Sequence, residues 1–288
     1  AHLGSFSFRL SFLMLGGFPI SNIQDAGTRR PLGPSNMLDR APSGLLQGAR
    51  LAIEQANERG GYLKRHIPFE LVISNDNGLW GASGNEIVKM AYDDHVWAIL
   101  GTIDGANSHI AIRVALKAEI PIINTGDTDP TFVETLIPWT FRNITDDRQM
   151  SYRLADFVFS ELGLQRVAAL RASNRYGRVS IDEFRDAATR LGHPFLVELQ
   201  YDVGDTDFRP QLEEIRALEP DVIVTWGDAA ESALILRQMR EMGMEQWLVG
   251  SDRMVTPEFL EVAGDWYFTP QFAAGLSVEF GGDVGGGH

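Results

Sequence analysis

The chain has 288 residues, of which 44% are hydrophobic and 22% charged, an ordinary balance for a globular protein of one large or two medium domains. A formal net charge of −14 argues against a broad basic surface, so no nucleic-acid partner is expected. The sequence has no cysteine, which excludes disulfides, thiolate metal sites and cysteine nucleophiles.

Residues 6–61 are predicted to form one strand, one long loop and one helix. An apolar run at residues 6–15 predicts a buried strand, and residues 10–20, which follow Arg9, could instead be the remnant of a signal peptide. Pro, Gly, Arg and Asn at residues 24–43 predict a long loop. An apolar stripe at helical spacing then predicts a helix with Ser43 as its N-cap, stopped by Gly60-Gly61.

Short apolar runs alternate with amphipathic stretches along the rest of the chain. Strands are predicted at residues 69–73, 97–100, 120–123, 166–170, 195–201, 221–225 and 247–249. Helices are predicted at residues 85–92, 107–118, 147–162, 179–191, 208–218 and 229–242. Thr145 or Asp146 should cap the helix at 147, and Gly192 and Gly243 should end two later helices.

This alternation predicts an α/β fold with two Rossmann-like lobes, each a parallel sheet flanked by helices. We expect an N-terminal α/β lobe at residues 1–143, a C-terminal α/β lobe at 144–272 and an uncertain or disordered tail at 273–288. The segment 139–147 is the expected crossing between the lobes and the candidate hinge.

The sequence lacks the common motifs of catalytic and cofactor-binding sites. It contains no phosphate-binding glycine loop, nucleophile elbow, zinc-protease helix or dinucleotide fingerprint. No two of the six histidines lie three or four residues apart, which argues against a histidine metal cage. We therefore expect no catalytic residue, no metal, no cofactor and no enzymatic activity, and we expect a structural role for His109.

Four predicted loops follow the carboxyl ends of strands, where parallel sheets bind ligands. They cover residues 101–108, 124–130, 172–178 and 225–231. Each combines small residues with hydroxyl, carboxylate or aromatic side chains and opens a helix, whose free N–H groups favour a negative ligand group. Two loops come from each lobe, so they could form a cleft that closes on a small solute.

Several residues in these loops have a structural alternative. Asp129 before Pro130 is a typical helix cap. Asp104 and Asp228 could be caps or ligand contacts. Tyr176 could pack against its own loop, and Trp226 could belong to the core.

Seven local patterns, in this order and spacing, resemble the leucine/isoleucine/valine-binding group of type I periplasmic binding proteins, which serve ABC transporters. They are residues 48–61, 121–124, 176–177, 204–208, 220–224, 236–243 and 257–265. The resemblance implies a two-lobed fold, a small polar ligand and a membrane permease or receptor complex as partner.

The resemblance also implies roles for individual residues. Loops of the family's first lobe hold the ligand's carboxylate, and an acidic residue of the second lobe holds its ammonium group. Glu231 matches that acid, and Asp228 competes with it. The candidate ligand-binding residues are Asp104, Gly105, Ala106, Gly126, Asp127, Thr128, Tyr176, Trp226, Asp228 and Glu231.

The sequence departs from the family pattern in two places. Asp104 and Gly105 stand where the family usually has two serines, and Asp127 lies in the second loop. Carboxylates repel an incoming carboxylate, so an amine, an amide, a polyol or a cationic amino acid is expected in place of an apolar amino acid. The match fades after Phe272, which suggests a fold shortened at its C-terminus.

The expected function is that of an extracytoplasmic solute-binding protein, periplasmic or extracellular, which captures a small polar ligand by hinge closure for ABC-type uptake. Two alternatives are a ligand-sensing module and a structural subunit that kept the fold and lost the ligand.

Overall fold

The computed structural model of the protein describes residues 8–14, 40–75, 80–103, 105–265 and 272–274. Contacts within the chain group it into two compact units, Ala1–Ile144 and Thr145–His288. Each unit contains one five-stranded sheet, and we describe each unit by itself. None of the described helices is both long enough and apolar enough to cross a membrane.

The sheet of the first unit has the strand order β2-β1-β3-β4-β5, and all its pairings are parallel. The strands are β1 (Phe8–Met14), β2 (Phe69–Asn75), β3 (Ala98–Leu100), β4 (Ile122–Asn124) and β5 (Thr140–Arg142). The helices are α1 (Arg40–Glu58), α2 (Trp80–Tyr92), α3 (Gly105–Ala118) and α4 (Thr131–Glu134).

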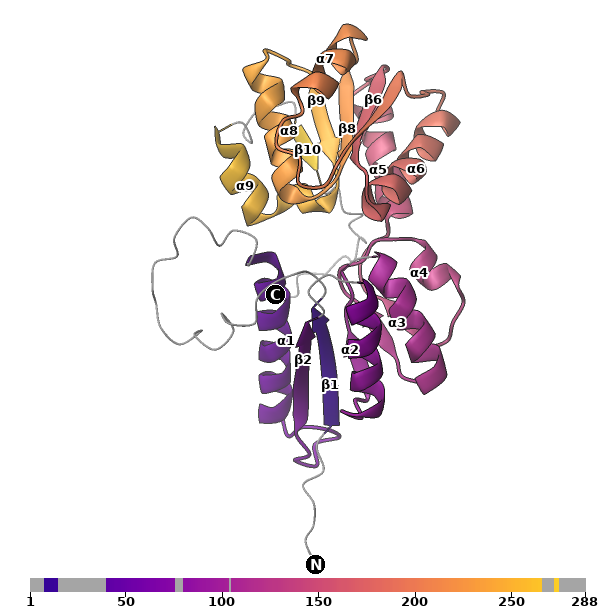
Figure 1. The fold of residues 1–288 in the computed structure, drawn as a ribbon, viewed down its shortest axis with the longest axis vertical. Coiled ribbons are helices and arrows are strands. Elements are labelled where there is room, and N and C mark those ends of the chain that lie inside the picture. Colours follow the sequence, from indigo (N-terminus) through magenta and orange to yellow (C-terminus); the bar gives the residue numbers. More distant parts are fainter. Residues whose placement is uncertain (1–7, 15–39, 76–79, 104, 266–271, 275–288) are drawn as a thin grey trace, which may run out of the picture. The chain divides into compact units, whose positions relative to one another are not determined.

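Helices cover both faces of this sheet. Consecutive strand residues point to opposite faces and therefore pack against different helices. Ile99 of β3 joins a fully buried cluster with Ile87 of α2 and Ala111 of α3. The next residue, Leu100, packs instead with Leu46 of α1. Figure 1 shows α1 on one side of the β1 and β2 strands and α2 on the other.

The sheet of the second unit has the order β10-β9-β8-β6-β7 and is also parallel throughout. The strands are β6 (Val167–Ala172), β7 (Val197–Tyr201), β8 (Val222–Trp226), β9 (Trp247–Gly250) and β10 (Phe272–Ala274). The helical elements are α5 (Asp147–Asp156), η3 (Phe157–Glu161), α6 (Arg175–Arg190), α7 (Arg209–Ala217), α8 (Ala229–Glu241), η4 (Asp252–Val255) and α9 (Pro257–Ala263).

Two hydrophobic cores lie on the two faces of this second sheet. Ala168 and Leu170 of β6 join the core formed with α7, α8 and α9. Val167 and Ala169 join the core formed with α5 and α6. All five residues of β8 are buried, as expected for a central strand covered on both faces. In Figure 1, α5 and α6 lie on the opposite side of the strands from α8 and α9.

Helix ends follow the sequence signals. Asp146 caps α5: its side chain accepts from the Gln149 backbone N–H at 2.8 Å, and the Gln149 side chain accepts from the Asp146 N–H at 3.3 Å. Gly192 and Gly243 follow the C-caps of α6 and α8 with φ of 91° and 71°, where glycine carries no steric cost. These end signals are confirmed.

Some boundaries differ from the prediction. Helix α1 begins at Arg40, so Ser43 lies inside the helix and is not its N-cap. The segment 139–147 contains the boundary between the two units, after Ile144, and also the edge strand β5, which was not predicted. Strand β10 extends to Ala274, so the expected tail from residue 273 begins within a strand. The rest of that tail, and residues 24–39 of the predicted loop, lie outside the described part of the chain, while residues 40–43 of that loop belong to α1.

Candidate functional site

The predicted loops lie at the carboxyl edges of the two sheets. In the first unit, β3 and β4 are neighbours, and the segments after Leu100 and Asn124 leave the same edge. In the second unit, β6, β8 and β9 are neighbours, and the starts of α6, α8 and η4 follow them at one edge. Parallel strands bring loops together in this way whatever their separation in the sequence.

Asn124, the last residue of β4, organises the second loop of the first unit. Its Oδ1 accepts hydrogen bonds from the backbone N–H groups of Gly126 at 2.9 Å and Asp127 at 2.8 Å. Gly126 is half-buried against Ile103 of the preceding loop, where an added Cβ would lie 3.2 Å from an Ile103 side-chain carbon. The two predicted loops of this unit therefore pack on each other.

Asp127 is the most perturbed group of this loop. Its side chain is buried, with 3% of the residue exposed, and its Oδ1 accepts from the Asp129 backbone N–H at 2.9 Å. Burial raises the pKa of Asp127 to about 6, while the nearby Ser108 hydroxyl and that backbone N–H oppose the shift. Asp127 can therefore exchange a proton near neutral pH, and a donor from a ligand would stabilise its charged form.

Unused polar atoms gather in the same loop. Asp127 Oδ2, Thr128 Oγ1 and Thr125 Oγ1 are buried and have no hydrogen-bond partner of good geometry among the described residues. Buried polar atoms are nearly always paired, so three neighbouring exceptions call for an explanation. A ligand that donates to the carboxylate and meets the two hydroxyls would supply the missing bonds.

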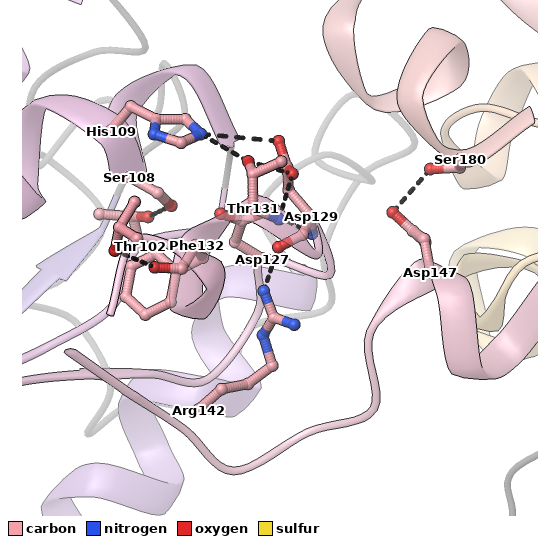
Figure 2. Close-up of polar contacts among 11 residues, drawn as sticks. Thr102, Ser108, His109, Asp127, Asp129, Thr131, Phe132, Arg142, Asp147 and Ser180 are labelled. Carbon is pink, nitrogen blue, oxygen red and sulfur yellow. Dashed lines mark hydrogen bonds and ion pairs between the residues drawn. The ribbon is translucent and has the colours of Figure 1, made fainter. Parts of the chain in front are cut away.

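The far end of this loop is occupied by structural contacts (Figure 2). Asp129 Oδ1 accepts from the Thr131 backbone N–H at 3.0 Å and from its hydroxyl at 2.6 Å, which fixes the start of α4. His109 Nε2 lies 2.9 Å from Thr131 Oγ1. Arg142 donates to the Asp129 carbonyl and lies over the Phe132 ring at 5.8 Å. Asp129 thus orders the helix start, although Pro130 occupies the N-cap position itself.

The first loop of this unit is only partly described. Asp104 lies outside the described residues, while Gly105 and Ala106 are half-buried in the first turn of α3. The Thr102 and Ser108 hydroxyls hydrogen-bond to each other beneath that turn.

Tyr176 lies in the first turn of α6, at the carboxyl end of β6. Asn174 caps this helix, and its Oδ1 accepts from the Gly177 backbone N–H at 2.9 Å. The Tyr176 ring packs in the core beside α5, and only 9% of the residue is exposed. Burial raises the pKa of Tyr176 well above its ordinary value, so the phenol stays neutral.

Arg253 lies over the Tyr176 ring. Its guanidinium carbon lies 3.7 Å from the ring centroid, a cation–π contact. The same guanidinium donates from Nη1 to Asp228 Oδ1. Asp228 is the N-cap residue of α8, but its side chain accepts no capping hydrogen bond, because it pairs with Arg253.

Glu231 follows in the first turn of α8 and is buried. Its Oε1 accepts from the Gly204 backbone N–H at 3.1 Å, which ties the loop after β7 to this helix. Asp228 and Glu231 were the two candidates to hold the ligand's ammonium group. In the structure Asp228 pairs with Arg253, and Glu231 accepts a hydrogen bond from a backbone N–H.

Trp226 ends β8 with a fully buried side chain in the core shared with α5 and α6. This is the alternative that the sequence left open for it. We therefore keep it as a core residue and do not count it among the proposed ligand contacts.

A buried polar contact steadies the helix that carries Tyr176. The Ser180 hydroxyl of α6 donates to Asp147 Oδ2 at 2.7 Å (Figure 2). The same hydroxyl lies equally close to the Tyr176 carbonyl oxygen. Asp147 opens α5, so this contact joins the two helices on one face of the sheet.

Arg253 is a candidate site residue that the sequence analysis missed. The strand at residues 247–249 was predicted, and the rule that ligand loops follow such strands also selects the segment that contains Arg253. Among the described residues, no group of three or more His, Asp or Glu side chains could hold a metal ion.

Comparison with known proteins assigns the family. A sequence model described as "Periplasmic binding protein" matches residues 40–274. An "Amino acid binding protein" of Pseudomonas aeruginosa is 26% identical over 238 residues, which cover 82% of this chain and 62% of that protein. "Leu/Ile/Val-binding protein homolog 1" of Brucella abortus is 24% identical over 237 residues, with the same coverage. The matched part therefore spans less than two thirds of these relatives.

Solved structures show the same fold. The isoleucine complex of the branched-chain amino acid transporter substrate-binding protein LivJ from Streptococcus pneumoniae superposes with a TM-score of 0.74 at 20% identity, covering 90% of this chain and 68% of that one. The leucine-binding protein LivK from Thermotoga maritima gives 0.74 at 22% identity, covering 90% and 67%. The chain belongs to the periplasmic binding protein family and has its type I fold.

Proposed function

We propose that this chain is the binding component of an ABC-type uptake system and captures a small polar solute of amino-acid size. The buried, unpartnered Asp127 Oδ2 at the carboxyl end of β4, with Thr125 and Thr128 beside it, is the observation that carries the proposal. The names of the relatives support the solute class, because they bind amino acids.

The proposed binding involves no bond chemistry. Loops of the first unit would offer Asp127, Thr128, Gly126 and the start of α3, and loops of the second unit would offer Tyr176, Asp228 and Glu231. A bound solute would favour the conformation to which it binds most tightly, and a membrane permease would recognise that conformation. Family membership supports an extracytoplasmic, periplasmic location for this work.

The Asp127 loop limits which solute groups fit it. Oδ2 is an acceptor, so the solute should place an N–H or O–H donor there: an ammonium, an amide or a hydroxyl. A donor replaces the water that a buried carboxylate has lost, and it would return the pKa of Asp127 toward its ordinary value.

The test is a binding screen on the purified chain with amino acids, amino acid amides, amines and polyols. A bound solute should raise the melting temperature, with a gain of about 2.7 kcal/mol in the free energy of unfolding when its concentration is about 100 times Kd. Calorimetry should then give a stoichiometry of one bound solute per chain.

A matched pair of variants localises the site. Asp127→Ala should abolish the calorimetric signal, while Asp93→Asn, which changes an exposed acid of the same unit, should leave it intact. A chain that binds no solute in the screen would favour the structural-subunit alternative. A chain that binds equally well after Asp127→Ala would place the site elsewhere.

A further inference from the structure

We propose that Arg253 selects the solute by binding a carboxylate group, so the second unit recognises an anionic end of the ligand. This inference rests on the proposed solute-binding function and adds the chemical class of the solute. It also reverses the expectation, drawn from the acidic loops, that a ligand carboxylate would be repelled.

The backbone around Arg253 is held on both sides. Its N–H donates to Ser251 Oγ at 3.3 Å, and its carbonyl oxygen accepts from Thr256 Oγ1 at 3.0 Å. Ser251 is the N-cap of η4, and Thr256 is the N-cap of α9. The start of the side chain is therefore fixed by the fold.

The guanidinium group is fixed as well. The Tyr176 ring supports one face of it at 3.7 Å, and Asp228 accepts from Nη1. A planar group held by a ring and by one ion pair retains few rotamers, so binding to it costs little conformational entropy.

Part of the guanidinium is available to a ligand. Arginine carries five N–H donors, and Nε and Nη2 have no hydrogen-bond partner among the described residues. The Arg253 side chain is 25% exposed, so part of it is accessible from solvent. Two parallel N–H groups match the two oxygens of a carboxylate, which is the geometry that arginine binds best.

Acidic groups surround Arg253, so an anion here must bind directly to the guanidinium. Asp228 pairs with Arg253 and Glu231 is oriented toward the Gly204 N–H, while Asp252 and Glu258 add negative charge nearby. Helices α6 and α8 both begin at this edge of the sheet, and their first-turn N–H groups favour negative charge. A solute carboxylate at this edge of the second sheet would use the guanidinium donors that the described residues leave without a partner.

The experiment compares each acid with its own amide. Four matched pairs of probes are L-glutamate with L-glutamine, L-aspartate with L-asparagine, L-leucine with L-leucinamide, and 4-aminobutanoate with its amide. A charged hydrogen bond lost on amidation predicts that the acid of a bound pair binds at least about tenfold more tightly than the amide.

Three variants separate selection from folding. Arg253→Gln should reduce the acid-to-amide ratio of affinities to about one, and Arg253→Lys, which keeps the charge but not the two-pronged geometry, should give an intermediate ratio. Arg209→Gln is the control, because Arg209 is an exposed arginine paired with Asp207 and Glu241 and should leave the ratio unchanged. A purely structural Arg253 would weaken acid and amide equally, and that result would overturn the proposal.

A second measurement does not depend on finding the solute. Acetate is titrated into the chain labelled with 15N-arginine, and the Nε–Hε resonance of Arg253 is identified by its loss in Arg253→Gln. A saturable shift supports the carboxylate site even if no amino acid binds, in which case only the proposed function fails. The absence of any saturable shift overturns the carboxylate site, whatever the solute screen shows.

Discussion

The guanidinium carbon of Arg253 lies 3.7 Å from the centroid of the Tyr176 ring, and this contact joins the segment after β9 to the first turn of α6. Because the ring is buried and the cation is partly withdrawn from water, the contact should be worth more than an exposed one.

A double-mutant cycle measures that contact. Urea unfolding of Tyr176→Leu, Arg253→Gln and the double variant should give a coupling free energy of about 1–2 kcal/mol. The cycle cancels the Arg253–Asp228 pair, which both Arg253 variants lose. Strictly additive effects would show that the ring and the guanidinium are neighbours without a stabilising interaction.

Asp127 should make the stability of the ligand-free protein depend on pH. Since burial raises the pKa of Asp127 from 3.8 to about 6, the folded state holds its proton more tightly than the unfolded state. The carboxyl therefore stabilises the fold fully below about pH 4 and loses this contribution as the pH rises through about 6, at a cost of at most about 3 kcal/mol.

Asp127→Asn removes this titration and keeps an oxygen for the Asp129 N–H. The variant should gain stability over the parent protein as the pH rises from about 4 to 7, measured by urea unfolding at each pH. Curves that run parallel across this range would mean that Asp127 has an ordinary pKa in the folded protein.

Gly177 should not accept a side chain. A Cβ at this position would lie 2.4 Å from the Ala172 carbonyl oxygen and 2.9 Å from its nitrogen, because α6 starts directly against the end of β6. Gly177→Ala should lower the free energy of unfolding by about 1–3 kcal/mol, since backbone atoms must shift. Gly48→Ala is the opposite case: nothing lies within 4 Å in exposed α1, so helix propensity should raise stability by about 0.5–1 kcal/mol. Thermal unfolding of both variants checks the sign, and a harmless Gly177→Ala contradicts the close packing.

The Ser180–Asp147 contact offers another matched pair. Ser180→Ala leaves a buried carboxylate oxygen without its 2.7 Å donor and should cost about 1–3 kcal/mol in denaturant unfolding. Ser151→Ala removes a hydroxyl of α5 that is buried and unpartnered among the described residues, so it should be neutral or slightly stabilising. Equal losses in the two variants would argue that removing the volume, and not the hydrogen bond, sets the cost.

The sequence predicted most strands and helices because their apolar runs are strong. Val222–Trp226 is an uninterrupted run and became a fully buried central strand. Thr140–Arg142 was missed because an edge strand of three half-buried and exposed residues leaves almost no hydrophobic pattern. The start of α1 was placed too late because Ser43 has the chemistry of a cap, while the backbone continues the helix to Arg40.

The candidate site was harder to predict for a physical reason. Strand order alone brings loops to one edge, so the Asp127 loop and Tyr176 could be found from their positions. The pairing of Arg253 with Asp228 depends on side-chain placement between elements far apart in the sequence, which no local pattern encodes. The same pairing places a positive charge beside Asp228, where the sequence alone indicated only acidic side chains.

The strand order of the second unit also bears on the order in which Tyr176, Asp228 and Arg253 can come together. Tyr176, Asp228 and Arg253 follow β6, β8 and β9, which are neighbours in the sheet in the order of synthesis. The ring and the acid are synthesised before the cation, and the guanidinium covers the ring only when the segment after β9 is in place. A fluorescent or NMR signal from Tyr176 would therefore report the docking of that segment on the sheet.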